Sequence, residues 1–188
     1  MKKEKRILLI LILIIVLLPV VPALAKKTTL SNISVTDTEG QLWVNFRVED
    51  CFTEEMNSAI ESGIDTTFTF FVRLYEKKKF DLDIKLVDIE ISHSIKYDNL
   101  KKHYELRLSE NGDEVVIVKD FGMAKRMMAE VTALNIISLD DLEKGVGYQI
   151  RMMAELDKIR LPFYLHYIFF FLSLWDFETD WYVNDFSY

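Results

Sequence analysis

The sequence predicts a mainly β protein: a single antiparallel β-sandwich-like domain of about eight strands with two or three short helices. Three observations support this fold class. Apolar and polar residues alternate in many short runs, turn residues separate those runs, and the helical patterns between them are short. Because all connections are short, we expect no second domain. A hydrophobic signal or anchor helix is expected to precede the domain.

The N-terminal segment has the order of parts of a secretory signal peptide. Four basic residues within positions 2–6 precede the unbroken apolar run Ile7–Leu18, and Ala23-Leu24-Ala25 is a small-x-small cleavage site. We therefore expect residues 1–25 to be removed and residues 26–188 to be exported as one domain. The alternative is an uncleaved anchor, since residues 7–24 are just long enough to span a thin bilayer. Either reading places the domain outside the inner membrane, periplasmic or anchored to it.

The first exported residues predict a β-hairpin. Residues 28–38 form a short strand, Glu39-Gly40 makes a turn, and residues 41–50 alternate strictly. On this second strand the apolar side chains at even positions point to one face, whereas Trp43 points to the other.

A helix and a strand are expected next. In residues 52–63 Thr53 can cap a helix with the apolar stripe Phe52, Met56, Ala59 and Ile60, and Gly63 can end it. Residues 64–79 return to alternation, with Phe71 and Tyr75 on the outward face, the type of face that also carries Trp43.

Residues 80–98 predict a strand with an irregularity. Apolar residues occupy even positions up to Leu86 and odd positions from Val87 onward. Since side chains alternate faces in a regular strand, this change of parity requires a β-bulge or a bend near Leu86-Val87.

The remaining elements alternate in type. We expect a hairpin at 103–120 with a tight turn at Asn111-Gly112, a helix over 123–135 with Met123, Met127 and Val131 on one side, and a short capped turn of helix at 138–145. Strands are expected at 147–157 and 175–186. In the last strand the predicted apolar face holds Trp175, Phe177, Trp181 and Val183.

The segment 161–175 is apolar on every side. As a helix, the segment is too short for a second membrane span. Its aromatic residues equally suit a strand. Burying only one face of it would leave apolar side chains exposed on the other faces. It therefore either closes the core of the domain or forms a surface for lipid or a partner. The candidate interaction surface consists of Phe163, Tyr164, Tyr167, Phe169, Phe170, Phe171 and Trp175, with Trp43 as an outward aromatic residue elsewhere.

Charge argues against some electrostatic partners, and the cysteine content excludes an internal disulfide. The chain has a formal net charge of −7, and residues 1–25 contribute +3, so the exported part carries −10. Such an acidic chain argues against nucleic acid and against anionic lipid as electrostatic partners. Cys51 is the single cysteine, which excludes an internal disulfide, and a small buried thiol is the expected role.

Catalytic and metal-binding patterns are absent from the sequence. It contains no GxSxG, HExxH, CxxC, GxGxxG or P-loop pattern, so no cofactor, metal or catalytic residue is predicted. His93 is expected to be a hydrogen-bonded core histidine. Asp81 and Asp83 would share one strand face, where a solvated edge is expected rather than a calcium site.

Several segments resemble, in order, the bacterial exported family catalogued as domain of unknown function 4390. The stretches are FTEEMNSAIESGIDTTFTFFVRLY, YDNLKKHYEL, YQIRMMAELDKIRLPF and WDFETDW. The residues that carry the resemblance are Phe52, Gly63, Tyr97, Asp98, Leu100, Tyr104, Tyr148, Arg151, Leu161, Pro162, Trp175, Thr179 and Trp181. The resemblance implies an N-terminal export signal or anchor, and it implies no activity or cofactor.

Three hypotheses for function follow. The first is a non-catalytic module of the cell envelope that contacts an envelope protein or the membrane surface through residues 161–175. The second is a binding protein for a small apolar ligand in a pocket lined by Met127, Met128, Met152 and Met153. The third is a hydrolase that uses His93, His103 and Asp81.

Overall fold

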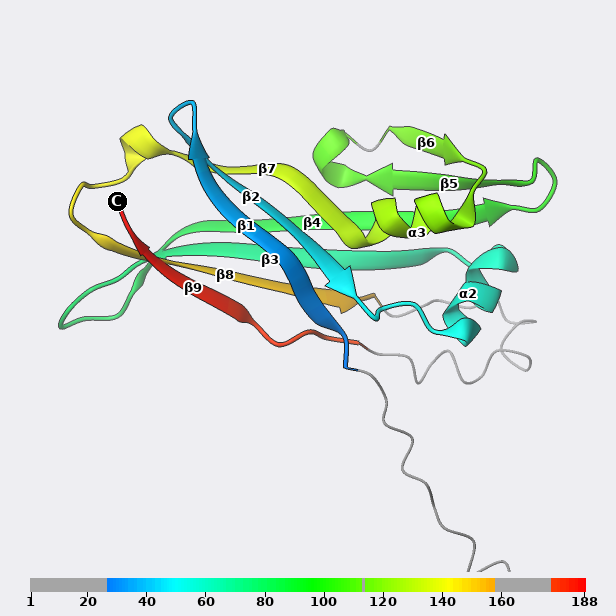
Figure 1. The fold of residues 1–188 in the computed structure, drawn as a ribbon, viewed down its shortest axis with the longest axis horizontal. Coiled ribbons are helices and arrows are strands. Elements are labelled where there is room, and N and C mark those ends of the chain that lie inside the picture. The colour runs from blue at the N-terminus through cyan, green and yellow to red at the C-terminus, as the bar shows by residue number, and fades with distance from the viewer. Residues whose placement is uncertain (1–26, 113, 158–176) are drawn as a thin grey trace, which may run out of the picture.

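The structure is a computed structural model that describes residues 27–112, 114–157 and 177–188. Within these ranges the chain forms nine strands in two antiparallel sheets and two α-helices (Figure 1). The prediction of a mainly β protein is confirmed. The N-terminal signal or anchor segment lies outside the described residues. No helix in the described ranges is long and apolar enough to cross a bilayer.

The smaller sheet has three strands in the order β1-β2-β7. Its strands are β1 (Thr29–Thr38), β2 (Gln41–Glu49) and β7 (Glu130–Ser138). The predicted hairpin is confirmed, because β1 pairs antiparallel with β2 and Thr38 lies opposite Gln41. All four even-numbered apolar residues of β2 are at most 3% exposed, as the alternation predicted.

The larger sheet has six strands in the order β6-β5-β4-β3-β8-β9. Its strands are β3 (Thr66–Glu76), β4 (Ile84–Asp98), β5 (His103–Leu108), β6 (Val115–Val118), β8 (Gly147–Leu156) and β9 (Tyr182–Ser187). The predicted irregularity in β4 is confirmed. Leu74 pairs with Val87 and Tyr75 pairs with Lys85, so Leu86 is the extra residue of a bulge.

The prediction that 80–83 continue the β4 strand is wrong. Residues 77–83 connect β3 to β4, and Phe80 and Leu82 are 95% and 86% exposed. The predicted hairpin at 103–120 is confirmed, since β5 pairs antiparallel with β6, but the predicted tight turn at Asn111-Gly112 is wrong. Residues 109–114 join β5 to β6, beginning with a short 3-10 helix, η1 (Ser109–Asn111), after which Gly112 adopts φ +77°.

Both α-helices begin at a polar cap. The helix α2 (Glu54–Glu61) is capped by Thr53, whose Oγ1 accepts a hydrogen bond from the Met56 amide at 3.2 Å, as predicted. The helix α3 (Phe121–Ala129) is capped by Asp120, and the predicted end at residue 135 is wrong, because the helix ends six residues earlier. Residues 130–138 form strand β7 instead, because Val131, Leu134 and Ile136 are buried in the smaller sheet. The predicted Met123 face is wrong as well, since Met123 is 48% exposed.

The C-terminal strand has the opposite phase to the one predicted. Tyr182 and Phe186 pack against the core, whereas Val183 is 48% exposed. Residues 177–181 precede the strand, and the predicted Trp175 lies outside the described residues. The predicted turn of helix after β7 is present as η2 (Leu139–Asp141), with Ser138 as its cap.

The two sheets share one hydrophobic core. Phe46 of β2 meets Phe70 of β3 edge to face, with ring centroids 5.8 Å apart. Figure 1 shows β1 and β2 crossing the larger sheet at an angle, with α3 beside them on the same side. We call this side of the six-stranded sheet its inner face. Odd-numbered residues of β3 and β8, including Phe71 and Tyr75, therefore point to the outer face.

Candidate interaction surface

The candidate surface residues are only partly described. Trp43 is half-buried on β2, and its Nε1 donates a hydrogen bond to the Thr38 carbonyl at 3.2 Å. Because it alternates with the core residues Val44 and Leu42, Trp43 faces away from the larger sheet. Trp43 and the outward aromatic residues of β3 thus lie on opposite outer faces of the two sheets. The other seven residues, Phe163, Tyr164, Tyr167, Phe169, Phe170, Phe171 and Trp175, lie outside the described residues.

The two chain ends that flank residues 158–176 lie side by side on the six-stranded sheet. The Leu156 amide donates to the Phe177 carbonyl at 2.9 Å. Two residues further along, the Ala154 amide donates to Oγ1 of Thr179, which is 3% exposed. The segment that carries most of the predicted surface therefore leaves and rejoins the domain at β8.

The outer face of this sheet carries an arginine–aromatic hollow of about 440 Å³. It is lined by Arg73, Tyr75, Gln149, Arg151, Trp181 and Val183. Arg73 and Arg151 lie directly opposite each other on β3 and β8. Arg73 Cζ lies 4.8 Å from the centre of the Trp181 ring, and Arg151 Cζ lies 4.5 Å from that of Tyr75. Stacking on these rings offsets part of the repulsion between the two cations.

Hydrogen bonds to the Nε atoms orient both guanidinium groups. Nε of Arg73 donates to Asp88 at 2.9 Å, and Nε of Arg151 donates to Gln149 at 2.6 Å. Hydrogen bonds from Lys85 and Arg73 hold the pKa of the Asp88 carboxyl below its usual range, so it stays ionised. A guanidinium has four further N–H donors on its terminal nitrogens, which suit planar recognition of carboxylate and carbonyl groups. The hollow is therefore equipped to bind such groups.

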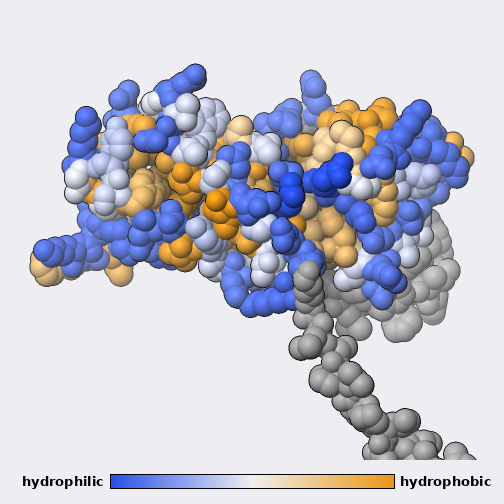
Figure 2. All heavy atoms as spheres, in the orientation of Figure 1, coloured by the Kyte–Doolittle hydropathy of each residue, from blue (hydrophilic) through white to orange (hydrophobic). Residues whose placement is uncertain are grey.

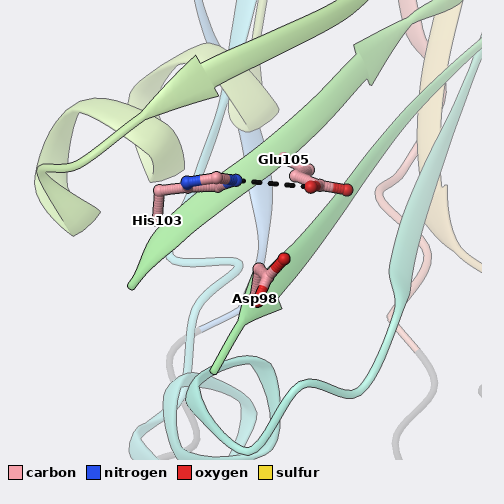
Figure 3. A group of neighbouring side chains, drawn as sticks. All are labelled: Asp98, His103 and Glu105. Atoms are coloured by element: carbon pink, nitrogen blue, oxygen red, sulfur yellow. Dashed lines mark hydrogen bonds and ion pairs between the residues drawn. The ribbon is translucent and has the colours of Figure 1, made fainter. Parts of the chain in front are cut away.

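A second group of polar side chains lies where β4 turns into β5. Ligand atoms of Asp98, His103 and Glu105 all lie within 4.8 Å of one another, and Figure 3 shows them converging from the two strands. Such donors suit a divalent cation. However, Lys101 Nζ lies 3.3 Å from Asp98 and 3.6 Å from Glu105, so an ammonium group already compensates both carboxylates.

This group also holds the turn. Oδ1 of Asp98 accepts hydrogen bonds from the amides of Leu100 and Lys101 at 2.8 and 2.9 Å. These bonds lower the pKa of the Asp98 carboxyl, and a hydrogen bond from His103 lowers that of Glu105. The geometry accounts for both carboxylates as parts of a β-turn network.

Comparison with known proteins bears on the identity of the chain. Residues 25–185 match the model of a family described as Domain of unknown function (DUF4390). The chain belongs to this family. No curated protein and no solved structure matches the chain.

Four of the residues that carried the resemblance to DUF4390 lie at the two places described above. Arg151 and Trp181 line the hollow, whereas Asp98 and Leu100 form the β4–β5 turn. The hollow could not be assembled from the sequence, because β3, β8 and β9 become neighbours only through long-range strand pairing. The group at the β4–β5 turn is local in sequence.

The hydrolase candidates of this DUF4390 chain do not come together. His93 is fully buried, as predicted, with Nδ1 3.0 Å from the Met128 carbonyl and Nε2 2.8 Å from Glu110. His103 lies five residues from the β5 partner of His93, which is about 17 Å along a strand. Asp81 is exposed in the connection between β3 and β4.

The methionines proposed to line an apolar pocket are also separated. Met152 and Met153 are consecutive on β8 and therefore point to opposite faces of the sheet. Met127 instead lines a hollow of about 350 Å³ beside α3, together with Met123, Arg126 and Glu110. Five of the eight lining residues are polar or charged, which is not the surface that an apolar ligand requires.

Proposed function

We propose that this DUF4390 protein is an exported, non-catalytic interaction module of the cell envelope. In this proposal residues 1–25 direct export or anchor the chain in the inner membrane, and residues 26–188 form one β-sandwich-like domain outside it. The apolar segment 161–175 contributes to the binding surface, together with the arginine–aromatic hollow.

The hollow is the observation that carries the proposal. Trp, Tyr and Arg are the residue types that contribute most to protein–protein binding energy. Here two arginines are held against Trp181 and Tyr75 on a sheet face whose partners for core packing lie on the other side. The ends of the 158–176 segment join the same sheet, which supports a common surface for both features.

The proposed partner is an envelope protein that offers carboxylate or carbonyl groups to the two arginines. A catalytic role is less well supported, because the described histidines are hydrogen-bonded within the fold and lie apart. Nucleic acid is excluded from the proposal by the acidic charge of the domain.

In-cell photocrosslinking tests this function. A photoreactive phenylalanine analogue at Val183, which is 48% exposed in the hollow, should give a defined protein adduct. The matched control is Ile117, which is 60% exposed on the edge strand β6 and should give none. The adduct at Val183 should be lost when Arg73→Gln and Arg151→Gln are combined. Equal adducts at both positions, or an adduct that survives loss of both arginines, would contradict the proposal.

The proposed export is tested separately, by the mass of the mature protein. The intact mass of protein recovered from the envelope should correspond to a chain that begins at Lys26, if the segment is cleaved after Ala25. A full-length mass in the membrane fraction would identify the anchored form, and a full-length protein in the cytoplasm would contradict export.

A further inference from the structure

The connection between β3 and β4 exposes large apolar side chains at the end of a projecting hairpin. Phe80 is 95% exposed and Leu82 is 86% exposed, and Ile84 at the start of β4 is 47% exposed. Figure 1 shows this connection extending beyond the neighbouring strands, and Figure 2 shows hydrophobic atoms on the projection beside hydrophilic ones. Exposed apolar groups gathered in this way are typical of an interaction site.

The same hairpin is positively charged in an acidic protein. The connection 77–83 contains Lys77, Lys78 and Lys79 against Asp81 and Asp83, a net charge of +1. The rest of the exported chain then carries −11. A negatively charged surface would therefore attract this hairpin and repel the remainder of the domain.

Three of the four lysines in residues 77–85 form exposed ion pairs. Lys77 pairs with Asp83 at 3.0 Å, Lys78 pairs with Glu76, and Lys85 pairs with Asp88. Exposed ion pairs contribute little free energy, so these lysines can exchange their partners for lipid phosphates. Lys79 Nζ lies 5.9 Å from the centre of the Phe80 ring, with no acidic partner among the described residues. An exposed cation without an acidic partner in the described part of the chain and the exposed Phe80 ring are thus adjacent.

We propose that the β3–β4 hairpin docks on the surface of a bilayer that contains anionic phospholipids. Phe80 and Leu82 enter the interfacial layer, and the lysines remain at the level of the lipid phosphates. The convex shape suits a deformable lipid surface, because a projecting tip with apolar groups on several sides needs no preformed pocket. Each lysine at an anionic surface strengthens binding about fivefold. This inference uses a different surface from the hollow and rests on the proposed function only for export.

A dye placed at the tip tests the docking. Cys51 is 3% exposed and burial raises its pKa to about 12, so a thiol-reactive dye labels only an added cysteine. The full chain with Phe80→Cys carries the environment-sensitive dye NBD and is reconstituted into nanodiscs. One set contains phosphatidylcholine alone, and the other contains an equal mixture with phosphatidylglycerol.

The matched control is Leu100→Cys. Leu100 is also 95% exposed and is followed by two lysines, but it lies in the β4–β5 turn at the opposite end of β4. In the phosphatidylglycerol nanodiscs the dye at position 80 should emit at shorter wavelength with at least about threefold higher intensity, while the dye at position 100 stays unchanged. Raising NaCl from 0.1 to 0.5 M should reverse most of the change, since salt screens exposed charges.

Three results would overturn the proposal. They are an unchanged spectrum at position 80, an equal change at positions 80 and 100, and a change of the same size without anionic lipid. None of these results involves Arg73, Arg151 or Val183, so the membrane proposal and the hollow can fail separately.

Discussion

Glu110 and His93 form a hydrogen-bonded pair beneath the surface between η1 and α3. The Glu110 side chain is 13% exposed, and its Oε1 lies 2.8 Å from Nε2 of the fully buried His93. Nδ1 of the same ring faces a carbonyl oxygen, which can only accept a hydrogen bond. The His93 ring therefore links the Met128 carbonyl to the Glu110 carboxyl group through its two nitrogens.

Glu110→Gln should make the free energy of unfolding less dependent on pH in the acidic range. Burial alone would raise the pKa of Glu110, but the hydrogen bond and charge of His93 outweigh it and lower that pKa. A carboxyl whose folded-state pKa is lowered stabilises the fold above its unfolded pKa of about 4.3, and this contribution is lost as the pH falls further. Glu110→Gln should lower the free energy of unfolding by about 1–2 kcal/mol at pH 7, and the difference should shrink between pH 5 and pH 3.

Urea unfolding at several pH values measures this difference. Glu114→Gln is the control, because Glu114 is exposed in the same β5–β6 connection and loses the same charge. If the two variants change in parallel with pH, the His93–Glu110 pair does not contribute in this way.

At the scale of elements, the turn after α2 shows why one glycine is needed. Gly63 has φ +86°, and its amide donates to the Ile60 carbonyl at 2.8 Å. A Cβ at this position would lie 3.1 Å from Nδ2 of Asn99 and 3.3 Å from the Tyr97 carbonyl oxygen. Gly63→Ala therefore combines a left-handed backbone with a close contact to another turn.

Gly40→Ala measures the cost of a side chain on a left-handed backbone without the close contact. Gly40 also has positive φ (+73°), but a Cβ there would meet no atom within 4 Å. Gly40→Ala should cost about 1 kcal/mol for the backbone alone, and Gly63→Ala should cost at least about 1 kcal/mol more because of the contact. Equal unfolding free energies for the two variants would show that the β4–β5 turn yields to the added methyl group.

The prediction of helices and strands succeeded where the apolar residues of a segment follow a single spacing. In β2, β3 and β8 the alternation defines the inner face, and the change of parity at Leu86-Val87 correctly indicated a bulge. It failed at β7, because Met123, Met127 and Val131 have helical spacing although the helix ends at Ala129. It also failed at Leu82, where alternating apolar and charged residues belong to an exposed tip. The four lysines around Phe80 and Leu82 were the signal that could have identified this surface.

At the scale of the whole molecule, the pairing of strands distant in the chain could not be predicted from the sequence. The hollow requires Arg73 and Arg151 to be neighbours, yet they are far apart in the chain and meet only because β8 returns beside β3. Likewise β7 joins β2 rather than β6, and nothing in its alternation selects that partner. Local patterns therefore predicted the fold class, whereas the composition of the candidate site depends on topology.

The shared core predicts that the two sheets unfold together and are energetically coupled through Phe46 and Phe70. Both rings are at most 1% exposed, and they belong to different sheets. Phe46→Leu and Phe70→Leu should each cost about 1–3 kcal/mol. Their combination should deviate from additivity by about 0.5–1.5 kcal/mol, the contribution of an edge-to-face aromatic pair beyond its buried area.

A double-mutant cycle with urea unfolding measures this coupling. Val183→Ala combined with Phe46→Leu is the control, because Val183 lies on the outer face of the larger sheet and cannot contact Phe46. That pair should be additive within about 0.5 kcal/mol. Fluorescence and circular dichroism should report the same single transition in every variant, since neither sheet has a core of its own. Separate transitions, or additivity of the two phenylalanine changes, would mean that each sheet is stabilised independently of the other.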